Sequence, residues 1–153
     1  MKFEYDYTFG LPRKIVWKYL KDEGILKKSI PNCRSFVETS KGLYHGRIDI
    51  KLGPIQDQFD ISIKRQVEKS PSLYRLFVKG KGSLGEVNAH ANILLKEAQQ
   101  GTSLNCKIEG QLSGALSLAE HHLTRGISNK SLETFFQAVE KEIKKSLYYM
   151  KRR

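Results

Sequence analysis

Residues 2–33, KFEYDYTFGLPRKIVWKYLKDEGILKKSIPNC, contain the change of periodicity that decides the fold. In the first eight of these residues, apolar and polar side chains alternate strictly, as they do in a half-buried β-strand. After residues 10–12 the apolar side chains recur at helical spacing, and Pro12 suits the first turn of a helix. Asp22 is suited to cap a second short helix, which Pro31-Asn32 ends. This stretch therefore predicts one strand followed by two short helices.

From Cys33 onward the period of two returns, and it continues almost to Gly114. Short turn sequences rich in Gly, Pro and Ser divide this region into segments that each have one apolar face. The predicted strands are residues 33–39, 42–52, 55–68, 72–80, 86–97 and 102–112. Short turns between consecutive strands favour an antiparallel meander.

Beyond Gly114 the apolar residues follow steps of mostly three and four as far as Leu147. This spacing predicts one amphipathic helix of roughly 30 residues with a kink near Gly126. The sheet needs a cover for its apolar face, and this helix is the only segment large enough. We therefore expect an α+β fold with a seven-stranded curved antiparallel sheet around a long C-terminal helix. A chain of 153 residues suits a single domain, residues 1–153.

Four stretches of the chain carry motifs that are weak one by one but specific in their order and spacing. They are Val16-Trp17-Lys18-Tyr19-Leu20 with Asp22, Ile25-Leu26 and Ser29-Ile30-Pro31-Asn32-Cys33; Lys51-Leu52-Gly53-Pro54-Ile55; Gly80-Lys81-Gly82-Ser83-Leu84-Gly85; and Gly110 with Gly114 and the Phe135-Phe136 pair. In these motifs the chain resembles the CoxG-like family, which is named for a subunit of carbon monoxide dehydrogenase. That family belongs to the START-related (SRPBCC) superfamily, which has the helix-grip fold.

The resemblance implies a function as well as a fold. Members of the superfamily bind hydrophobic molecules between sheet and helix, and CoxG-like members are accessory proteins of molybdenum hydroxylases. The chain is thus expected to be a non-catalytic carrier or accessory protein for a lipid- or quinone-like ligand, with a molybdenum-dependent dehydrogenase as partner. The alternative is a cavity enzyme of the polyketide cyclase/aromatase type. No nucleophile elbow or paired catalytic motif is present in the sequence, so no catalytic residue and no cofactor are assigned.

A curved sheet around one helix leaves a space that either fills with side chains or holds a ligand. The apolar faces predict that this space is lined by Tyr44, Ile48, Phe59, Ile61, Leu76, Val78, Ala89, Ala91, Ile108, Leu116, Leu123, Ile127, Phe135 and Phe136. The same residues would form an ordinary core if the space is filled. The small side chains of Ala89 and Ala91 favour some open volume.

Asp57 and Arg65 are two charged residues that alternation places on the same apolar face. A charge directed into an apolar space costs several kcal/mol unless it is paired or hydrated. Either residue could therefore be a polar contact for a ligand carbonyl or hydroxyl. The alternative is that both lie near strand ends and reach water.

The histidines and cysteines show no spacing typical of a metal site. His121 and His122 are adjacent, so on a helix they point about 100° apart and cannot chelate one metal in the usual i, i+4 manner. Neither Cys33 nor Cys106 has a neighbour at ligand spacing. We therefore expect no metal site.

The net charge is +11, from 27 Lys and Arg against 16 Asp and Glu. Residues 141–153 hold six of these basic residues and one acid, with aromatic residues among them. Such a mixture suits an anionic membrane surface, and the predicted contacts are Lys144, Lys145, Lys151, Arg152 and Arg153. The alternative is a solvated helix end, with residues 146–153 as a frayed basic tail. No nucleic-acid motif or aromatic stacking platform is recognisable in the sequence, so nucleic acid is not an expected partner.

The expected location follows from three further features of the sequence. No apolar run is long enough to span a bilayer, and the first residues lack the apolar region of a signal peptide. Two cysteines are too few for a disulfide scaffold. The sequence therefore predicts a cytoplasmic protein, which would touch the inner face of the membrane only peripherally.

Overall fold

Seven strands form one antiparallel sheet in the computed structural model, which describes residues 1–52, 55–119 and 129–151. The strands are β1 (Lys2–Phe9), β2 (Cys33–Ser40), β3 (Leu43–Leu52), β4 (Ile55–Lys69), β5 (Leu73–Gly82), β6 (Gly85–Ala98) and β7 (Gly101–Ser113). Their order in the sheet is β1-β7-β6-β5-β4-β3-β2. The predicted meander is confirmed, because β2 to β7 are neighbours in sequence order and β1 joins the sheet beside β7.

Two short helices follow β1, as predicted. Helix α1 (Arg13–Tyr19) begins after Pro12, whose backbone is extended. Helix α2 (Glu23–Ser29) is capped by Asp22, whose carboxylate accepts the backbone N–H of Ile25 at 3.0 Å. Such caps satisfy one of the N–H groups that a helix leaves without a partner at its start.

The long C-terminal helix, α4 (Asn129–Lys151), is confirmed, but the prediction of where it begins is wrong. Residues Gly114–Ala119 form a 3-10 helix, η1, instead of the first turns of an α-helix. Gly114 has a φ of +68°, which turns the chain sharply at the end of β7. The N–H of Leu116 then donates to the carbonyl of Leu84 at 2.8 Å, so η1 is tied to the β5–β6 turn. The predicted kink near Gly126 lies outside the described residues.

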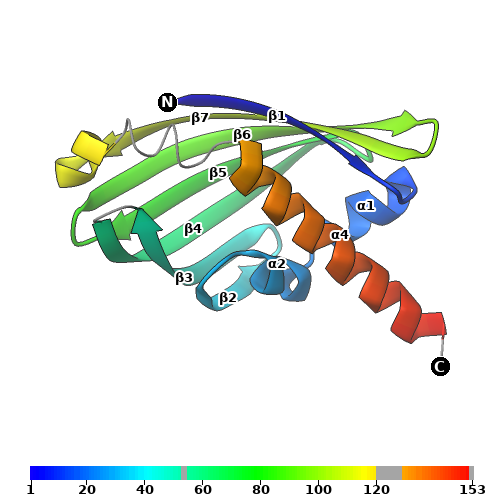
Figure 1. Cartoon of the computed structure of the whole chain (residues 1–153), viewed down its shortest axis with the longest axis horizontal. Helices are drawn as coiled ribbons and strands as arrows, with labels where there is room; N and C mark the ends of the chain where they lie inside the picture. The colour runs from blue at the N-terminus through cyan, green and yellow to red at the C-terminus, as the bar shows by residue number, and fades with distance from the viewer. Residues whose placement is uncertain (53–54, 120–128, 152–153) are drawn as a thin grey trace.

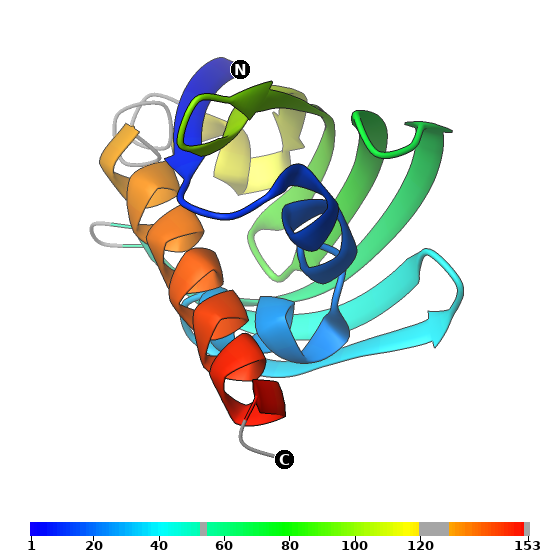
Figure 2. The same cartoon turned by 90° about the vertical axis from the view of Figure 1, so that its right-hand side faces the viewer.

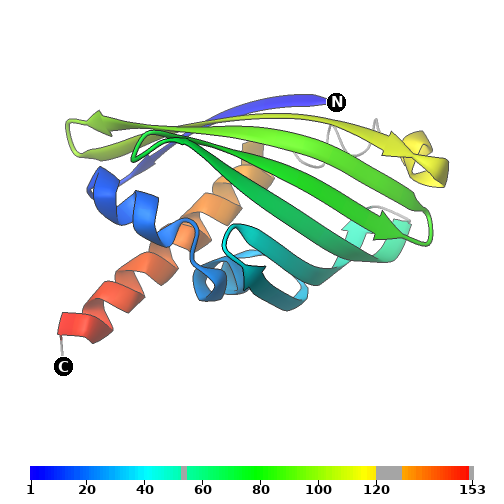
Figure 3. The ribbon, with the colours of Figure 1, turned by 180° about the vertical axis from the view of Figure 1, so that it is seen from behind.

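The helices lie on the concave side of the curved sheet (Figure 1). Figure 2 shows the strands as a bent wall, with α4 along its open side and α1 and α2 beside it. Helix α4 contacts both α2 and β1. Seen from behind in Figure 3, strands β4 to β7 form the outer wall, and the C-terminal end of α4 extends past the sheet. The interior between sheet and helices is where the apolar faces meet.

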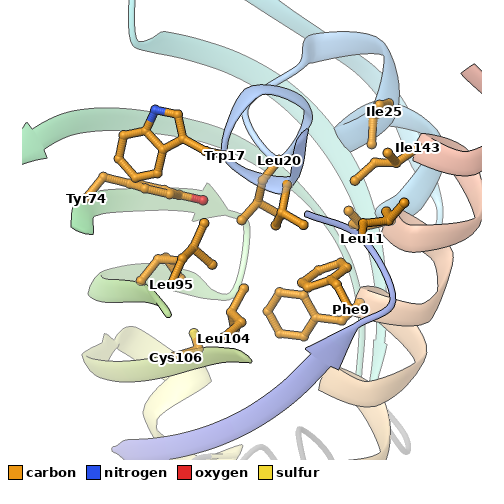
Figure 4. Close-up of a cluster of buried hydrophobic side chains, with 14 of the residues drawn as sticks. Phe9, Leu11, Trp17, Leu20, Ile25, Tyr74, Leu95, Leu104, Cys106 and Ile143 are labelled. Atoms are coloured by element: carbon orange, nitrogen blue, oxygen red, sulfur yellow. The ribbon is translucent and has the colours of Figure 1, made fainter. Parts of the chain in front are cut away.

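Two hydrophobic clusters fill most of this interior. The larger one lies at the α1 end, where Phe9, Leu95 and Leu104 are fully buried and pack with Trp17 and Tyr74 (Figure 4). The rings of Trp17 and Tyr74 meet edge to face at 5.3 Å between centroids. The smaller cluster forms at the other end of the sheet around Phe59 and Leu116. Residues of both clusters line the space that remains open.

Candidate functional site

An apolar pocket of about 340 Å³ lies between the concave face of the sheet, α2 and α4. This volume is near the lower end of the range typical of small-molecule sites, roughly 300–1,000 Å³. The residues predicted for the cavity that line it are Tyr44, Leu76, Val78, Ala89, Ala91, Ile108, Phe135 and Phe136, together with Arg65. Ala89 and Ala91 both face this open volume, beside each other on β6.

Several wall residues were not predicted. Leu20, Leu26 and Ile30 come from the α1–α2 region and line the pocket. Sequence reasoning assigned the cover of the sheet to the C-terminal helix only, so these residues were missed although their helical spacing was visible. Phe3 and Tyr74 also line the pocket, and the alternation of their strands could have identified both.

Four of the predicted cavity residues do not line this pocket. Ile48, Phe59, Ile61 and Leu116 form the smaller hydrophobic cluster instead. The turn at Gly114 brings η1 back over the end of the sheet, so Leu116 packs on Phe59 and both are almost fully buried. Two more predicted residues, Leu123 and Ile127, lie outside the described residues.

Asp57 also lies away from the pocket. Its carboxylate accepts the backbone N–H of Leu84 at 3.0 Å and the hydroxyl of Ser83 at 2.9 Å, in the β5–β6 turn. These hydrogen bonds, led by the one from Leu84, hold the pKa of Asp57 below its usual value. A side chain at Gly82 would place its Cβ 2.5 Å from the same carboxylate. Asp57 and part of the glycine cluster therefore build a turn.

Arg65 stands at a polar end of the pocket. Its Nη1 donates to the hydroxyl oxygen of Tyr44 at 2.6 Å, and that hydroxyl donates to the carbonyl of Lys21, also at 2.6 Å. The Nε of Arg65 is buried and has no hydrogen-bond partner among the described residues. Burial raises the pKa of Tyr44 to about 12, although the charge of Arg65 opposes this in part. Tyr44 is therefore neutral and able to donate.

Lys21 adds a second cation to this end of the pocket. Burial, followed by the charges of Arg65 and Lys41, lowers its pKa to about 8. Its Nζ lies 4.1 Å from the centre of the Trp17 ring, a cation–π contact. The polar end of the pocket thus combines Arg65, Lys21 and the Tyr44 hydroxyl.

Burial keeps two further groups of the pocket, the Cys106 thiol and the Tyr74 hydroxyl, in their neutral forms. Burial raises the pKa of the Cys106 thiol to about 12, so the nucleophilic thiolate is absent near neutral pH. Burial also raises the pKa of Tyr74. Among residues 1–52, 55–119 and 129–151, no group of three or more His, Cys, Asp or Glu side chains could hold a metal ion. The arrangement is suited to binding an apolar molecule with a polar end.

The end of α4 presents aromatic and apolar side chains to solvent. Tyr148, Tyr149 and Met150 are 54%, 67% and 61% exposed. Of the predicted membrane contacts, Lys144 pairs with Glu140 at 3.0 Å, and Lys145 pairs with Glu142 at 3.6 Å. The side chain of Lys151 and the whole of Arg152 and Arg153 lie outside what the structure describes. No helix within the described ranges has the length and apolar character needed to cross a bilayer.

Comparisons with known proteins agree with this architecture. The family model of CoxG, a subunit of carbon monoxide dehydrogenase, matches residues 9–144. A conserved protein from Geobacillus kaustophilus is similar in structure, with a TM-score of 0.86 and 26% identity over 95% of this chain and 97% of its own. The Zhui aromatase/cyclase from Streptomyces sp. R1128 is similar in fold, with a TM-score of 0.68 and 13% identity over 96% and 95% of the two chains. No curated protein matches the sequence.

Proposed function

Since the chain belongs to the CoxG family of carbon monoxide dehydrogenase, we propose that it is a non-catalytic carrier of a hydrophobic, lipid- or quinone-like ligand. The observation that supports this proposal is the open pocket of about 340 Å³, whose walls are almost entirely apolar. Removing apolar ligand surface from water contributes about 25 cal/mol per Å² to the free energy of binding, so such walls favour an apolar ligand. The ligand would lie between the sheet and α4.

The carrier proposal is tested by filling the pocket. Ala91 faces the open volume on β6, so Ala91→Phe places a ring where the ligand would lie. We expect this variant to bind the neutral dye Nile red at least about tenfold more weakly than the unaltered protein. Its melting temperature should not fall, because the ring enters open volume and not a packed core.

Ala98→Phe is the matched control, because it adds the same ring at the exposed end of the same strand. This control should bind Nile red like the unaltered protein. Native mass spectrometry of the purified protein then identifies any ligand retained from the cell. Equal dye binding by Ala91→Phe and Ala98→Phe would contradict the proposal.

The partner of the carrier is proposed from the family alone. The family is named for a subunit of carbon monoxide dehydrogenase, so we propose that the chain serves a molybdenum-dependent dehydrogenase as an accessory protein in the cytoplasm. Gel filtration of the chain mixed with the purified molybdenum hydroxylase of its own host tests this. A stable or ligand-dependent complex is the expected result, and separate elution with and without ligand would contradict it.

A cavity enzyme of the cyclase/aromatase type is the second candidate. The observation in its favour is Lys21, whose pKa of about 8 is suited to proton transfer and which lies beside the hydrogen-bonded Arg65–Tyr44 pair. An enzyme of this type would lose turnover of a polyketide substrate in Lys21→Met. A carrier would show no turnover with either protein.

We also propose that the end of α4 contacts anionic membranes peripherally. The exposed side chains of Tyr148, Tyr149 and Met150 beside basic residues support this, since each basic residue near an anionic surface contributes roughly 1 kcal/mol. Deletion of residues 148–153 keeps Leu147, which packs against the core. The deletion should reduce cosedimentation with phosphatidylglycerol vesicles at low salt by about tenfold or more, and it should leave binding to phosphatidylcholine vesicles unchanged.

The control for this deletion removes the same number of charges elsewhere. Lys14, Lys64 and Lys79 are exposed on other elements, so the triple variant Lys14→Gln, Lys64→Gln and Lys79→Gln matches the three cations lost from the tail. If the triple variant and the deletion weaken vesicle binding equally, the attraction belongs to the net charge and not to the end of α4.

A further inference from the structure

The polar end of the pocket is positively charged. Arg65 and Lys21 both line it, and the group hydrogen-bonded to Arg65, the Tyr44 hydroxyl, is neutral. We propose that the ligand is a single-chain amphipathic molecule whose carboxylate head group binds at Arg65 and Lys21. This inference rests on the proposed carrier function, and it adds the charge and the orientation of the ligand.

Neither of the two nearby carboxylates forms an ion pair with Arg65 in the described part of the chain. Asp22 and Glu38 are close enough to influence Tyr44, but each has a backbone partner of its own. Asp22 accepts the N–H of Ile25 at 3.0 Å, and Glu38 accepts the N–H of Gly42 at 2.9 Å. In the described part of the chain, Arg65 has no ion pair, and its buried Nε has no hydrogen-bond partner.

Arg65 is partly buried, and a partly buried cation without a counterion is unfavourable, so a carboxylate on the ligand would relieve this. Guanidinium and carboxylate groups match in geometry and form charge-assisted hydrogen bonds. Arg65 has donors to spare, because only Nη1 is bonded to Tyr44. Lys21 is a second cation whose charge is unfavourable at this place, since its pKa is lowered by burial and by the charge of Arg65. An anion at this place would stabilise both cations.

The rest of the pocket fits an apolar tail. Arg65 on β4 lies opposite Leu76 on β5, which lies opposite Ala91 on β6. The row continues to Ile108 on β7 and Phe3 on β1, and all five residues line the pocket. Neighbouring strands are about 4.8 Å apart, so this row spans roughly 19 Å of the curved sheet. The charge stands at one end of the row, and only apolar side chains follow it.

The volume restricts the class of ligand. About 340 Å³ is near the lower end of the range for small-molecule sites and favours one hydrocarbon chain over a two-chain phospholipid. A head group at Arg65 would leave the tail pointing toward β1. The ligand class is thus a fatty-acid-like monoanion, with a neutral quinone as the competing outcome.

The test compares dodecanoate with 1-dodecanol, which differs from it only in the head group, and with decylubiquinone as a neutral quinone. Displacement of Nile red from the unaltered protein is measured for each of the three ligands at pH 7, below the micelle concentration of dodecanoate and the solubility limits of the two neutral ligands. We expect dodecanoate to bind about tenfold or more tightly than 1-dodecanol, because only the anion gains the charge-assisted bonds. Arg65→Gln should remove this preference by weakening dodecanoate binding much more than 1-dodecanol binding, while Arg65→Lys should retain part of it.

Arg47→Gln is the control, because Arg47 is an exposed cation of β3 that pairs with Asp60. It should keep the full preference for dodecanoate. Equal affinity for dodecanoate, 1-dodecanol and decylubiquinone in the unaltered protein would overturn the inference and leave the carrier function standing. A preference for dodecanoate that survives Arg65→Gln would overturn it as well. If none of the three ligands displaces the dye, the carrier function itself fails.

Discussion

Lys21 lies between α1 and α2, where its charge is unfavourable for folding. Its pKa of about 8 is lower than the value near 10.4 expected in an unfolded chain. The folded protein therefore disfavours the protonated form, so the charge lowers the free energy of unfolding at neutral pH. This penalty is fully present below pH 8, and it disappears as the pH rises from about 8 toward 10.4.

Lys21→Met should therefore raise the melting temperature at pH 7. The methionine can still pack on the Trp17 ring, which compensates for the lost cation–π contact. The gain over the unaltered protein should shrink steadily when the pH is raised from 8 to 10. Lys14→Met, at an exposed position of α1, should show no such gain. A difference in melting temperature that is constant across this pH range would refute the argument.

Arg65 and Asp57 show what alternation along a strand can predict. Both were placed on the apolar face of β4, and only the structure shows how far along the strand the cover extends. Arg65 lies under the α1–α2 region and lines the pocket. Asp57 lies near the other end of β4, where the β5–β6 turn supplies N–H donors. The period of a strand gives the face of a residue, but the position of the cover depends on contacts between distant segments.

At the scale of elements, Glu140 ties α4 to β1. Its carboxylate accepts the hydroxyl of Tyr7 at 2.7 Å and the N–H of Gly10 at 3.1 Å, and it pairs with Lys144. Burial alone would raise the pKa of Glu140, but these hydrogen bonds outweigh it and lower the pKa. Glu140 is therefore an anchor between two elements that are far apart in the sequence.

Glu140→Ala should lower the free energy of unfolding by about 1–3 kcal/mol, because it leaves the Tyr7 hydroxyl and the Gly10 N–H without this acceptor. Urea unfolding followed by circular dichroism measures the effect. Glu133→Ala, at an exposed site on the same helix, is the control and should change the stability little. Equal losses from the two variants would show that Glu140 does not anchor α4.

The start of α4 shows where helical periodicity misleads. The apolar spacing after Gly114 continues without interruption, so it predicted one helix through Leu116. In the structure Leu116 lies in a 3-10 helix and packs against Phe59. Its backbone N–H donates a hydrogen bond to the carbonyl of Leu84. A hydrogen bond between segments that are distant in sequence prevails here over a local pattern. The remainder of the pattern, from Leu132 on, is helical as predicted.

At the scale of the whole molecule, the order of elements was enough to predict the fold. Periodicity and turn residues predicted seven strands and two short helices. The apolar face of the sheet required a cover, which the long C-terminal helix could supply. The pocket was harder to predict, because its polar end forms where Lys21, Tyr44 and Arg65 meet. These residues come from a loop and two strands, and no local pattern indicates that a loop carbonyl reaches Tyr44. The polar end of the pocket therefore forms only when these distant segments come together in the folded chain.

The position of β1 in the sheet has a consequence for how the chain folds. β1 is the first strand to be synthesised, but it pairs with β7, so that Lys2 lies opposite Glu109 and Phe9 opposite Thr102. Closing so long a loop costs entropy before any contact repays it, and folding rates fall as contacts become more distant in sequence. The row of pocket residues that runs across the sheet from Arg65 on β4 to Phe3 on β1 is therefore complete only after nearly all of the sheet has left the ribosome. Nascent chains expose the apolar face of β1 until then, and this exposed surface makes them prone to aggregation.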